Sequence, residues 1–111
     1  MGRSRVTSEI WVSALRKRLE SKAVPIFIIK KGNKQAGAII IRVSNLCGRS
    51  KIFVQAPNLD NERRWLELAN GSDAEMEEVL QDQQKFDQDV WILEVEELYG
   101  TQFFDEFLMP K

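Results

Sequence analysis

The segment DVWILEVEEL, residues 89–98, alternates apolar and acidic side chains, and this pattern constrains the fold more than any other stretch of the chain. In an extended backbone, Trp91, Leu93 and Val95 lie on one side, whereas Ile92, Glu94 and Glu96 lie on the other. A helix repeats every 3.6 residues and would mix the two sets. The segment is therefore predicted to be a β-strand.

Four further segments combine β-branched or aromatic residues with turn residues at their ends, and each is predicted to be a strand. They are PIFIIK (25–30), AIIIRV (38–43), KIFVQA (51–56) and RWLELA (64–69). Short connections that contain glycine join the first three, which favours an antiparallel meander. The fourth should end at residues 70–71 and present two alternating sets of side chains, which are Trp65, Glu67 and Ala69 on one face and Arg64, Leu66 and Leu68 on the other.

Three segments carry apolar residues at helical spacing. The first spans residues 8–22, with Ser8 as its cap and an apolar stripe formed by Ile10, Trp11, Ala14, Leu15 and Leu19. The second follows the capping-box sequence SDAE, residues 72–75, and extends to Phe86, with Met76, Val79, Leu80 and Gln83 facing inward. The third, TQFFDEFLM, spans residues 101–109.

The predicted order is α-β-β-β-β-α-β-α, which is typical of an α+β domain. We expect a single domain over residues 1–111, built from a mostly antiparallel five-stranded sheet with helices on one face. Residues 1–7 should form a flexible N-terminal end, and residues 101–111 a C-terminal helical tail. One core should unite the apolar faces of these elements, namely Trp11, Leu15, Ile39, Ile41, Leu66, Trp91 and Leu93.

The chain of 111 residues contains no histidine. This removes Ser-His-Asp and Cys-His nucleophile pairs, His-ligated zinc and the side chain that most often carries protons near neutral pH. The single cysteine, Cys47, cannot form an internal disulfide and leaves a structural zinc site without ligands. The N-terminus lacks the apolar run of a signal peptide, and no apolar stretch is long enough to span a bilayer. We therefore predict a cytoplasmic protein with no cofactor and no membrane association.

The net charge of −1 conceals a strong asymmetry between the two halves of the chain. Residues 1–55 contain twelve lysines and arginines and two acids, whereas residues 56–111 contain four basic residues and fifteen acids. Such a division can mark a nucleic-acid-binding face, because basic side chains supply non-specific affinity for phosphate. The interpretation that we favour is mutual neutralisation of the halves, because the basic residues are spread over a helix, two turns and strand ends.

Two loop motifs suggest ligand sites, and each has a simpler interpretation. The loop GNKQAG, residues 32–37, is basic and glycine-rich, but a phosphate-binding loop leads into a helix, and a strand follows here. A hairpin is therefore favoured. Asp87, Asp89, Glu94 and Glu96 could supply oxygen ligands to a hard cation, although alternating carboxylates are also what a solvated strand face contains. We predict no metal site.

Two clusters are candidates for binding a ligand or partner. In the segment ERRW, Arg63 and Arg64 lie close in sequence to Glu67. Such arginines can bind a carboxylate or phosphate ligand, or they can form ion pairs within the protein. We favour the ion pairs. In FFDEFL, Phe103 and Phe107 lie four residues apart, so a helix would place them on one face. That face would either close the core or contact a partner, including a second copy of the chain.

Four motifs in this order, SEIWVSALRKRLE, GAIIIRV, ERRWLELA and FDQDVWILEVEE, resemble the bacterial domain-of-unknown-function family 1491. The resemblance covers residues 8–97 and rests on Trp11, Gly37, Arg63, Arg64, Glu67, Trp91 and Glu94. Cys47 and the tail after residue 100 lie outside the pattern. The resemblance implies a small bacterial cytoplasmic protein, and it carries no catalytic residue or cofactor over to this chain.

The combined prediction is a small non-enzymatic domain that binds a protein partner or forms a homodimer. A nucleic-acid-binding protein that uses the basic N-terminal half is the first alternative, and a carboxylate-metal-dependent enzyme is the second. The candidate binding residues are Arg63, Arg64, Glu67, Phe103 and Phe107, and no residue is assigned a catalytic role.

Overall fold

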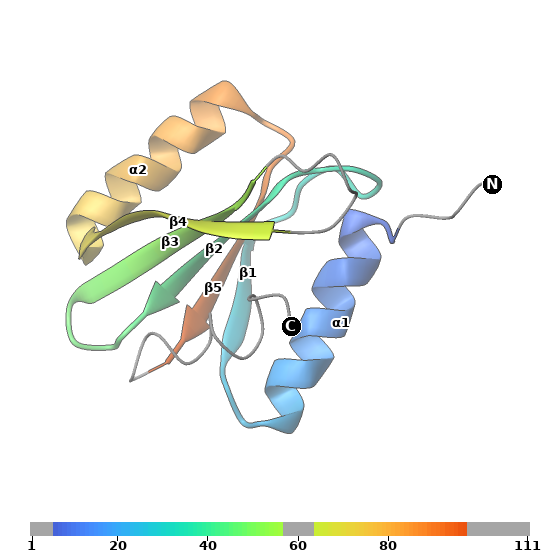
Figure 1. Ribbon diagram of the computed structural model, residues 1–111, viewed down its shortest axis with the longest axis horizontal. Helices are drawn as coiled ribbons and strands as arrows, with labels where there is room; N and C mark the ends of the chain where they lie inside the picture. Colours follow the sequence, from blue (N-terminus) through green and yellow to red (C-terminus); the bar gives the residue numbers. More distant parts are fainter. Residues whose placement is uncertain (1–5, 57–63, 98–111) are drawn as a thin grey trace.

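Five strands form one sheet in the order β1-β5-β2-β3-β4, and two helices pack against it (Figure 1). The structure, a computed structural model, describes residues 6–56 and 64–97, except the side chains of Ala56 and Arg64. The elements are α1 (Ser8–Ser21), β1 (Ile26–Lys30), β2 (Ile39–Ser44), β3 (Arg49–Ala56), β4 (Arg64–Ser72), α2 (Asp73–Phe86) and β5 (Trp91–Glu96). The α+β class and the five-stranded, mostly antiparallel sheet are confirmed. The predicted third helix lies outside the described residues.

The strand order differs from the predicted meander of the first three strands. β2, β3 and β4 do form an antiparallel meander, but β5 lies between β1 and β2, antiparallel to the former and parallel to the latter. Alternation along a strand reports which side chains share a face, and it carries no information about the neighbouring strand. β5 is thus an internal strand, and Trp91, Ile92 and Leu93 are buried on its two faces.

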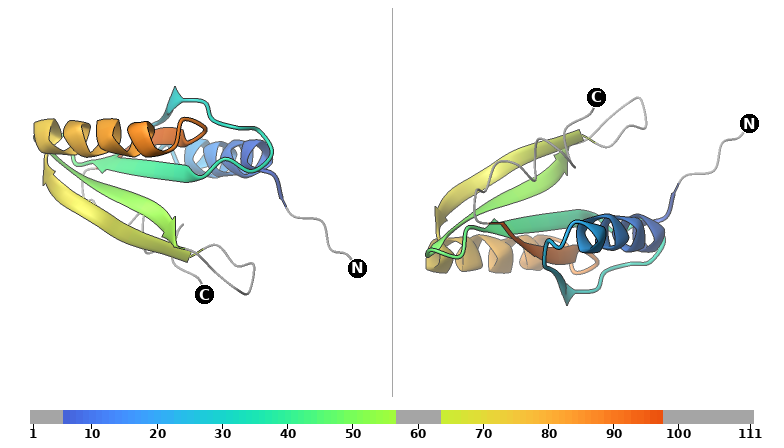
Figure 2. Two further views of the ribbon diagram at one scale, coloured as in Figure 1. Left: turned by 90° about the horizontal axis from the view of Figure 1, so that it is seen from above. Right: turned by 90° about the horizontal axis from the view of Figure 1, so that it is seen from below.

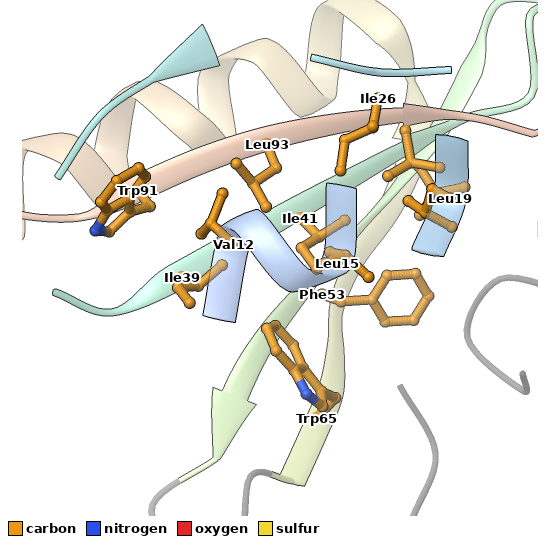
Figure 3. Close-up of a cluster of buried hydrophobic side chains, with 12 residues drawn as sticks. Val12, Leu15, Leu19, Ile26, Ile39, Ile41, Phe53, Trp65, Trp91 and Leu93 are labelled. Carbon is orange, nitrogen blue, oxygen red and sulfur yellow. The ribbon is translucent and has the colours of Figure 1, made fainter. Parts of the chain in front are cut away.

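The two helices cover opposite faces of the sheet, so the expectation of helices on one face was wrong. α1 packs on the larger cluster, which Figure 3 shows between this helix and the sheet. Its buried members are Val12, Leu15, Leu19, Ile26, Ile39, Ile41, Val43, Phe53, Trp65, Trp91, Leu93 and Val95. α2 packs on a smaller cluster of Ile40, Ile52, Met76, Leu80, Val90 and Ile92. Because Ile40 and Ile92 alternate with members of the larger cluster, β2 and β5 are apolar on both sides.

A β-bulge changes the predicted face assignment in β4. Ile52 pairs with Ala69 and Phe53 pairs with Glu67, so Leu68 is an extra residue. The alternation therefore shifts: Trp65 belongs to the α1 side, whereas Ala69 packs against the α2-side cluster. Leu66 was predicted in the core but is 56% exposed, because it lies on the α2 side where that helix does not cover it. The other six predicted core residues belong to the α1-side cluster, Trp11 as a partly buried member.

The predicted boundaries hold for α2 and need correction for α1 and β4. Ser72 and Glu75 form the predicted capping box, and β4 continues through residues 70–71 up to it. Thr7 rather than Ser8 caps α1, since the Thr7 hydroxyl accepts a hydrogen bond from the Ile10 amide at 3.2 Å. Both residues carry the hydroxyl that capping requires, and the fold buries Ser8 instead.

The apolar stripe of α1 is also rotated from the predicted one. The residues that face the sheet are Val12, Leu15 and Leu19, whereas Ile10 and Ala14 are exposed. Both stripes have helical spacing, so periodicity alone could not choose between them. Trp11 lies at the border and stacks on Trp65 of β4, with ring centroids 5.4 Å apart.

Candidate interaction surfaces

The loop GNKQAG is tightly packed and offers no cradle for phosphate. Its backbone amides point inward: the Asn33 amide donates to the carbonyl of Asp89, and the Asn33 side-chain oxygen accepts from the amides of Gln35 and Ala36. A side chain at Gly37 would overlap the Asp89 carbonyl oxygen, so a glycine is required there. The hairpin interpretation was wrong as well, because β5 separates the two strands that the loop connects.

The same loop occupies the amino end of α1. The carbonyls of Gln35 and Lys34 accept hydrogen bonds from the amides of Ser8 and Glu9, and the Ser8 hydroxyl donates to the Gly37 carbonyl at 2.6 Å. These amides are the groups with which a helix could bind an anion. The phosphate interpretation is therefore excluded at both the loop and the helix.

A partly buried arginine forms a polar cluster that was not predicted from the sequence. Arg42 of β2 has a side chain only 12% exposed, and it donates to the Ser50 hydroxyl, the Glu77 carboxylate and the Asp73 carbonyl. The Ser50 hydroxyl in turn donates to the Asp73 carboxylate at 2.8 Å. The cluster joins β2 and β3 to the first turns of α2. An arginine within the apolar strand AIIIRV was the available signal, because a buried arginine needs partners.

The predicted residues around ERRW do not form a described site. Arg63 lies outside the described residues, and Arg64 begins β4 opposite Ala56 with a side chain that is not described. Glu67 is half exposed and lies 3.8 Å from the ammonium of Lys51 on the adjacent strand. The cross-half ion pairs that the structure describes are thus made by Arg42 and Lys51, with acids of the second half.

The acidic residues of the metal hypothesis do not converge within the described part of the chain, where no group of three potential ligands forms a metal site. The Asp87 carboxylate accepts a hydrogen bond from the Asp89 amide. Phe103 and Phe107 lie outside the described residues. Among these residues, neither helix has the length and apolar character needed to cross a membrane.

β1 lies at one margin of the sheet, and no other described strand pairs with its outer edge. The carbonyl of Pro25 accepts a hydrogen bond from the Glu96 amide at 3.0 Å, and the ladder continues through the pairs Ile26–Val95, Phe27–Glu94 and Ile28–Leu93. Hydrogen-bonded and non-hydrogen-bonded residue pairs alternate in an antiparallel ladder. Since Pro25 and Glu96 form a hydrogen-bonded pair, the N–H and C=O groups of Ile26 and Ile28 point away from β5. No other described residue forms a hydrogen bond with these outward groups.

Apolar side chains accompany this open edge. Phe27 is 48% exposed and Ile29 58% exposed, whereas Ile26 and Ile28 pack against the α1-side core. On the other face, α2 packs on Ile40, Ile52 and Ile92, from β2, β3 and β5, and Figure 2 shows β1 and β4 at opposite margins of the sheet. Within the described part of the chain, no helix covers the sheet face beside Phe27.

A second apolar feature is a shallow groove of 220 Å³ between the end of α2 and the sheet. Its lining includes Ile40, Val54, Leu68 and Gln83. Pockets for drug-sized ligands commonly enclose roughly 300–1,000 Å³, so this groove is too small for such a molecule. A large exposed apolar side chain, Phe86, lies near the groove on the last turn of α2.

Solved structures share this fold. The chain is 29% identical to protein Atu0922 from A. tumefaciens, whose solution structure superposes with a TM-score of 0.78, covering 97% of this chain and 99% of that one. A crystal structure of a DUF1491 family protein from Caulobacter crescentus is 26% identical, with a TM-score of 0.75 over 85% of this chain and 90% of that one. None of the curated proteins is significantly similar in sequence. Residues 6–105 match the family described as protein of unknown function (DUF1491), and the chain belongs to that family.

Proposed function

We propose that this protein is a small, non-enzymatic interaction domain and that β1 is its contact strand. The observation that carries the proposal is the open edge at Ile26 and Ile28, flanked by the exposed Phe27 and Ile29. A partner strand added to such an edge satisfies the main-chain groups, while alternate side chains provide specificity. An exposed apolar edge strand that stays unpaired is an aggregation hazard, so pairing also has a protective value.

Binding is favoured over catalysis because the Arg42 cluster and the cap of α2 are both engaged in holding the fold. Arg42 is surrounded by partners that hold α2 to the sheet. The pKa of Glu75 lies below its ordinary value, because the Ser72 amide and hydroxyl hydrogen bond to its carboxylate in the helix cap. The sequence contains no histidine to act as a general base.

A nucleic-acid-binding function is the alternative, and the outer side of α1 supports it. Arg16, Lys17 and Lys22 are exposed on or just after this helix, although Arg16 lies 3.8 Å from the carboxylate of Glu20. Affinity for an arbitrary oligonucleotide that falls steeply with salt, and that Lys17→Glu weakens, would favour this alternative. Arg42 and Lys51 contribute little to it, because both are engaged with acids.

We also propose that the protein acts in the bacterial cytoplasm. Its structural relatives come from A. tumefaciens and Caulobacter crescentus, and its cysteine, Cys47, is free and exposed, as a reducing compartment permits. Phe103 and Phe107 stay a predicted second contact of the same interaction domain, and Arg63, Arg64 and Glu67 stay predicted binding residues.

A photo-crosslinking amino acid at position 27 tests the interaction function in bacterial cells. We expect a discrete protein adduct from position 27 and none from position 86, where Phe86 is 87% exposed but lies away from the β1 edge. The adduct should disappear when Ile29→Lys is added, and the purified partner should bind the unmodified protein but not its Phe27→Lys variant. Equal labelling at both positions, or no adduct at position 27, would contradict the proposal.

A further inference from the structure

The outward groups of β1 are arranged symmetrically about Phe27. Ile26 and Ile28, one on each side of it, direct their N–H and C=O groups away from β5, whereas the bonded pair Phe27–Glu94 directs its groups inward. If a copy of this strand is turned through 180°, each outward donor meets an outward acceptor. The edge is therefore complementary to itself.

We propose that the partner of β1 is β1 of a second copy of this chain, paired antiparallel about a twofold axis through Phe27. This inference rests on the proposed function of β1 as the contact strand. Ile26 then pairs with Ile28 of the other copy, and the two Phe27 residues face each other. An interface of this kind is isologous, as the contacts of twofold-symmetric dimers are.

The side chains favour this register on both faces of the joined sheet. Phe27 occupies a pair without direct hydrogen bonds, where opposing side chains approach most closely, and the two half-exposed rings would cover each other. On the opposite face, Ile28 is partly buried against the α1-side core, so its contact with Ile26 of the second copy would extend that core. Both copies of α1 would lie on this face.

The limits of the open ladder also match a second copy better than a long foreign strand. β1 begins at Ile26, and a bulge between Ile28 and Lys30 interrupts its regular pairing. The available ladder is therefore short and equal in length on both partners. Lysine often guards an edge strand against pairing. Here the Lys30 ammonium instead donates to the carbonyls of Gln88 and Val90, within its own subunit.

Charge exchange at position 27 tests the register, because only a twofold axis through this residue makes it face itself. Sedimentation equilibrium should show a reversible dimer of the 12.9 kDa chain. Phe27→Lys and Phe27→Glu should each raise the dissociation constant at least about tenfold, since like charges directly opposite are destabilising. An equal mixture of the two variants should dimerise again. The matched pair Phe86→Lys and Phe86→Glu should leave the dissociation constant unchanged, whether alone or mixed.

Disulfide formation tests the same register by geometry. In a Cys47→Ser background, Phe27→Cys should oxidise to a covalent dimer, because opposing residues of such a pair lie within disulfide reach. Ile29→Cys should not, since residue 29 and its copy would lie four residues, roughly 13 Å, apart along the strands. Equal crosslinking of both variants, or failure of the charge mixture to dimerise, would overturn the proposed register.

The outcomes separate this inference from the function on which it rests. A protein that stays monomeric at every concentration, but is crosslinked through position 27 to a different protein, would overturn the homodimer and support the interaction domain. A monomer that captures nothing through position 27 would overturn both. Both would be supported by a position-27 adduct of twice the chain mass, together with dimerisation of the mixed Phe27→Lys and Phe27→Glu variants.

Discussion

The two faces of the sheet are held to their helices by different means. α1 lies on a cluster of twelve buried apolar residues, and a loop fixes its amino end through backbone hydrogen bonds. α2 packs in a cluster of only six buried apolar residues, and Arg42 and Ser50 join its first turns to the sheet. Where the apolar contact is small, a polar anchor at one end of the helix sets its position. The α2-side cluster ends at Ile92 of β5, so among the described residues no helix covers the sheet beside Phe27 of β1.

The largest expected effect lies on the α1 side. Leu93→Ala removes a side chain with 0% exposure from the centre of the larger cluster and should cost about 2–5 kcal/mol of the free energy of unfolding. Leu80→Ala on the α2 side should cost less, because the smaller cluster can collapse more readily around the deletion. Urea denaturation of the two variants, with the exposed Leu66→Ala as control, measures the comparison. Equal losses for Leu93 and Leu80 would mean that the faces do not differ as we describe.

The next effect tests whether a polar anchor holds α2. Arg42→Met keeps much of the side-chain volume but removes the donors to Asp73, Ser50 and Glu77, and it should cost about 1.5–3 kcal/mol. Arg16→Met, which breaks an exposed ion pair on α1, should cost only about 0.3–0.5 kcal/mol. Hydrogen exchange should also show faster opening of α2 than of α1 in the Arg42 variant. Similar costs for the two substitutions would refute the anchor.

The elements that the sequence predicted correctly are those in which one local signal decides the structure. The capping box placed the start of α2, and the alternation through Trp91, Leu93 and Val95 placed β5 with the correct faces. The insertion of β5 beside β2 is a pairing over long sequence distance, and no local pattern records it. The bulge at Leu68 is likewise set by pairing with β3. The sequence pattern does not reveal it, so the prediction assigned Trp65 and Ala69 of β4 to the same face.

The candidate site was less predictable than the fold. The open edge of β1 depends on which strand lies at the margin of the sheet, and that order follows from tertiary pairing. Phe27 and Ile29 read as ordinary strand residues in PIFIIK, and their exposure becomes visible only once α2 is placed elsewhere. The Arg42 cluster had a sequence signal, a single charge in an apolar strand, but its partners Asp73 and Glu77 lie more than 30 residues away.

A smaller effect concerns the cap of α2. Ser72→Ala removes the hydroxyl that accepts a hydrogen bond from the Glu75 amide at 3.1 Å, and it should cost about 1 kcal/mol of the free energy of unfolding. Because the Arg42 cluster holds the same turn through Asp73, the Ser72 and Arg42 substitutions should not be additive. A double-mutant cycle by urea denaturation measures the coupling. Strict additivity would mean that the cap and the arginine act on α2 independently.

The smallest effect is a pH dependence at the cap of α2. The backbone N–H of Ser72, followed by its hydroxyl, lowers the pKa of Glu75 from the ordinary value of 4.5, and the charge of Arg49 adds to this. A carboxyl whose pKa is lower in the folded state contributes stability above its unfolded pKa and loses it as the pH falls through the folded value. Glu75→Gln keeps the capping geometry without the charge, so the stability difference from the native protein should shrink as the pH falls below 4.5. Denaturation of both proteins between neutral and acidic pH measures this difference. Glu78→Gln, on an exposed position of the same helix with no cap contact in the described residues, is the control. A constant difference for Glu75→Gln over this range would show that the cap does not depend on the carboxylate charge.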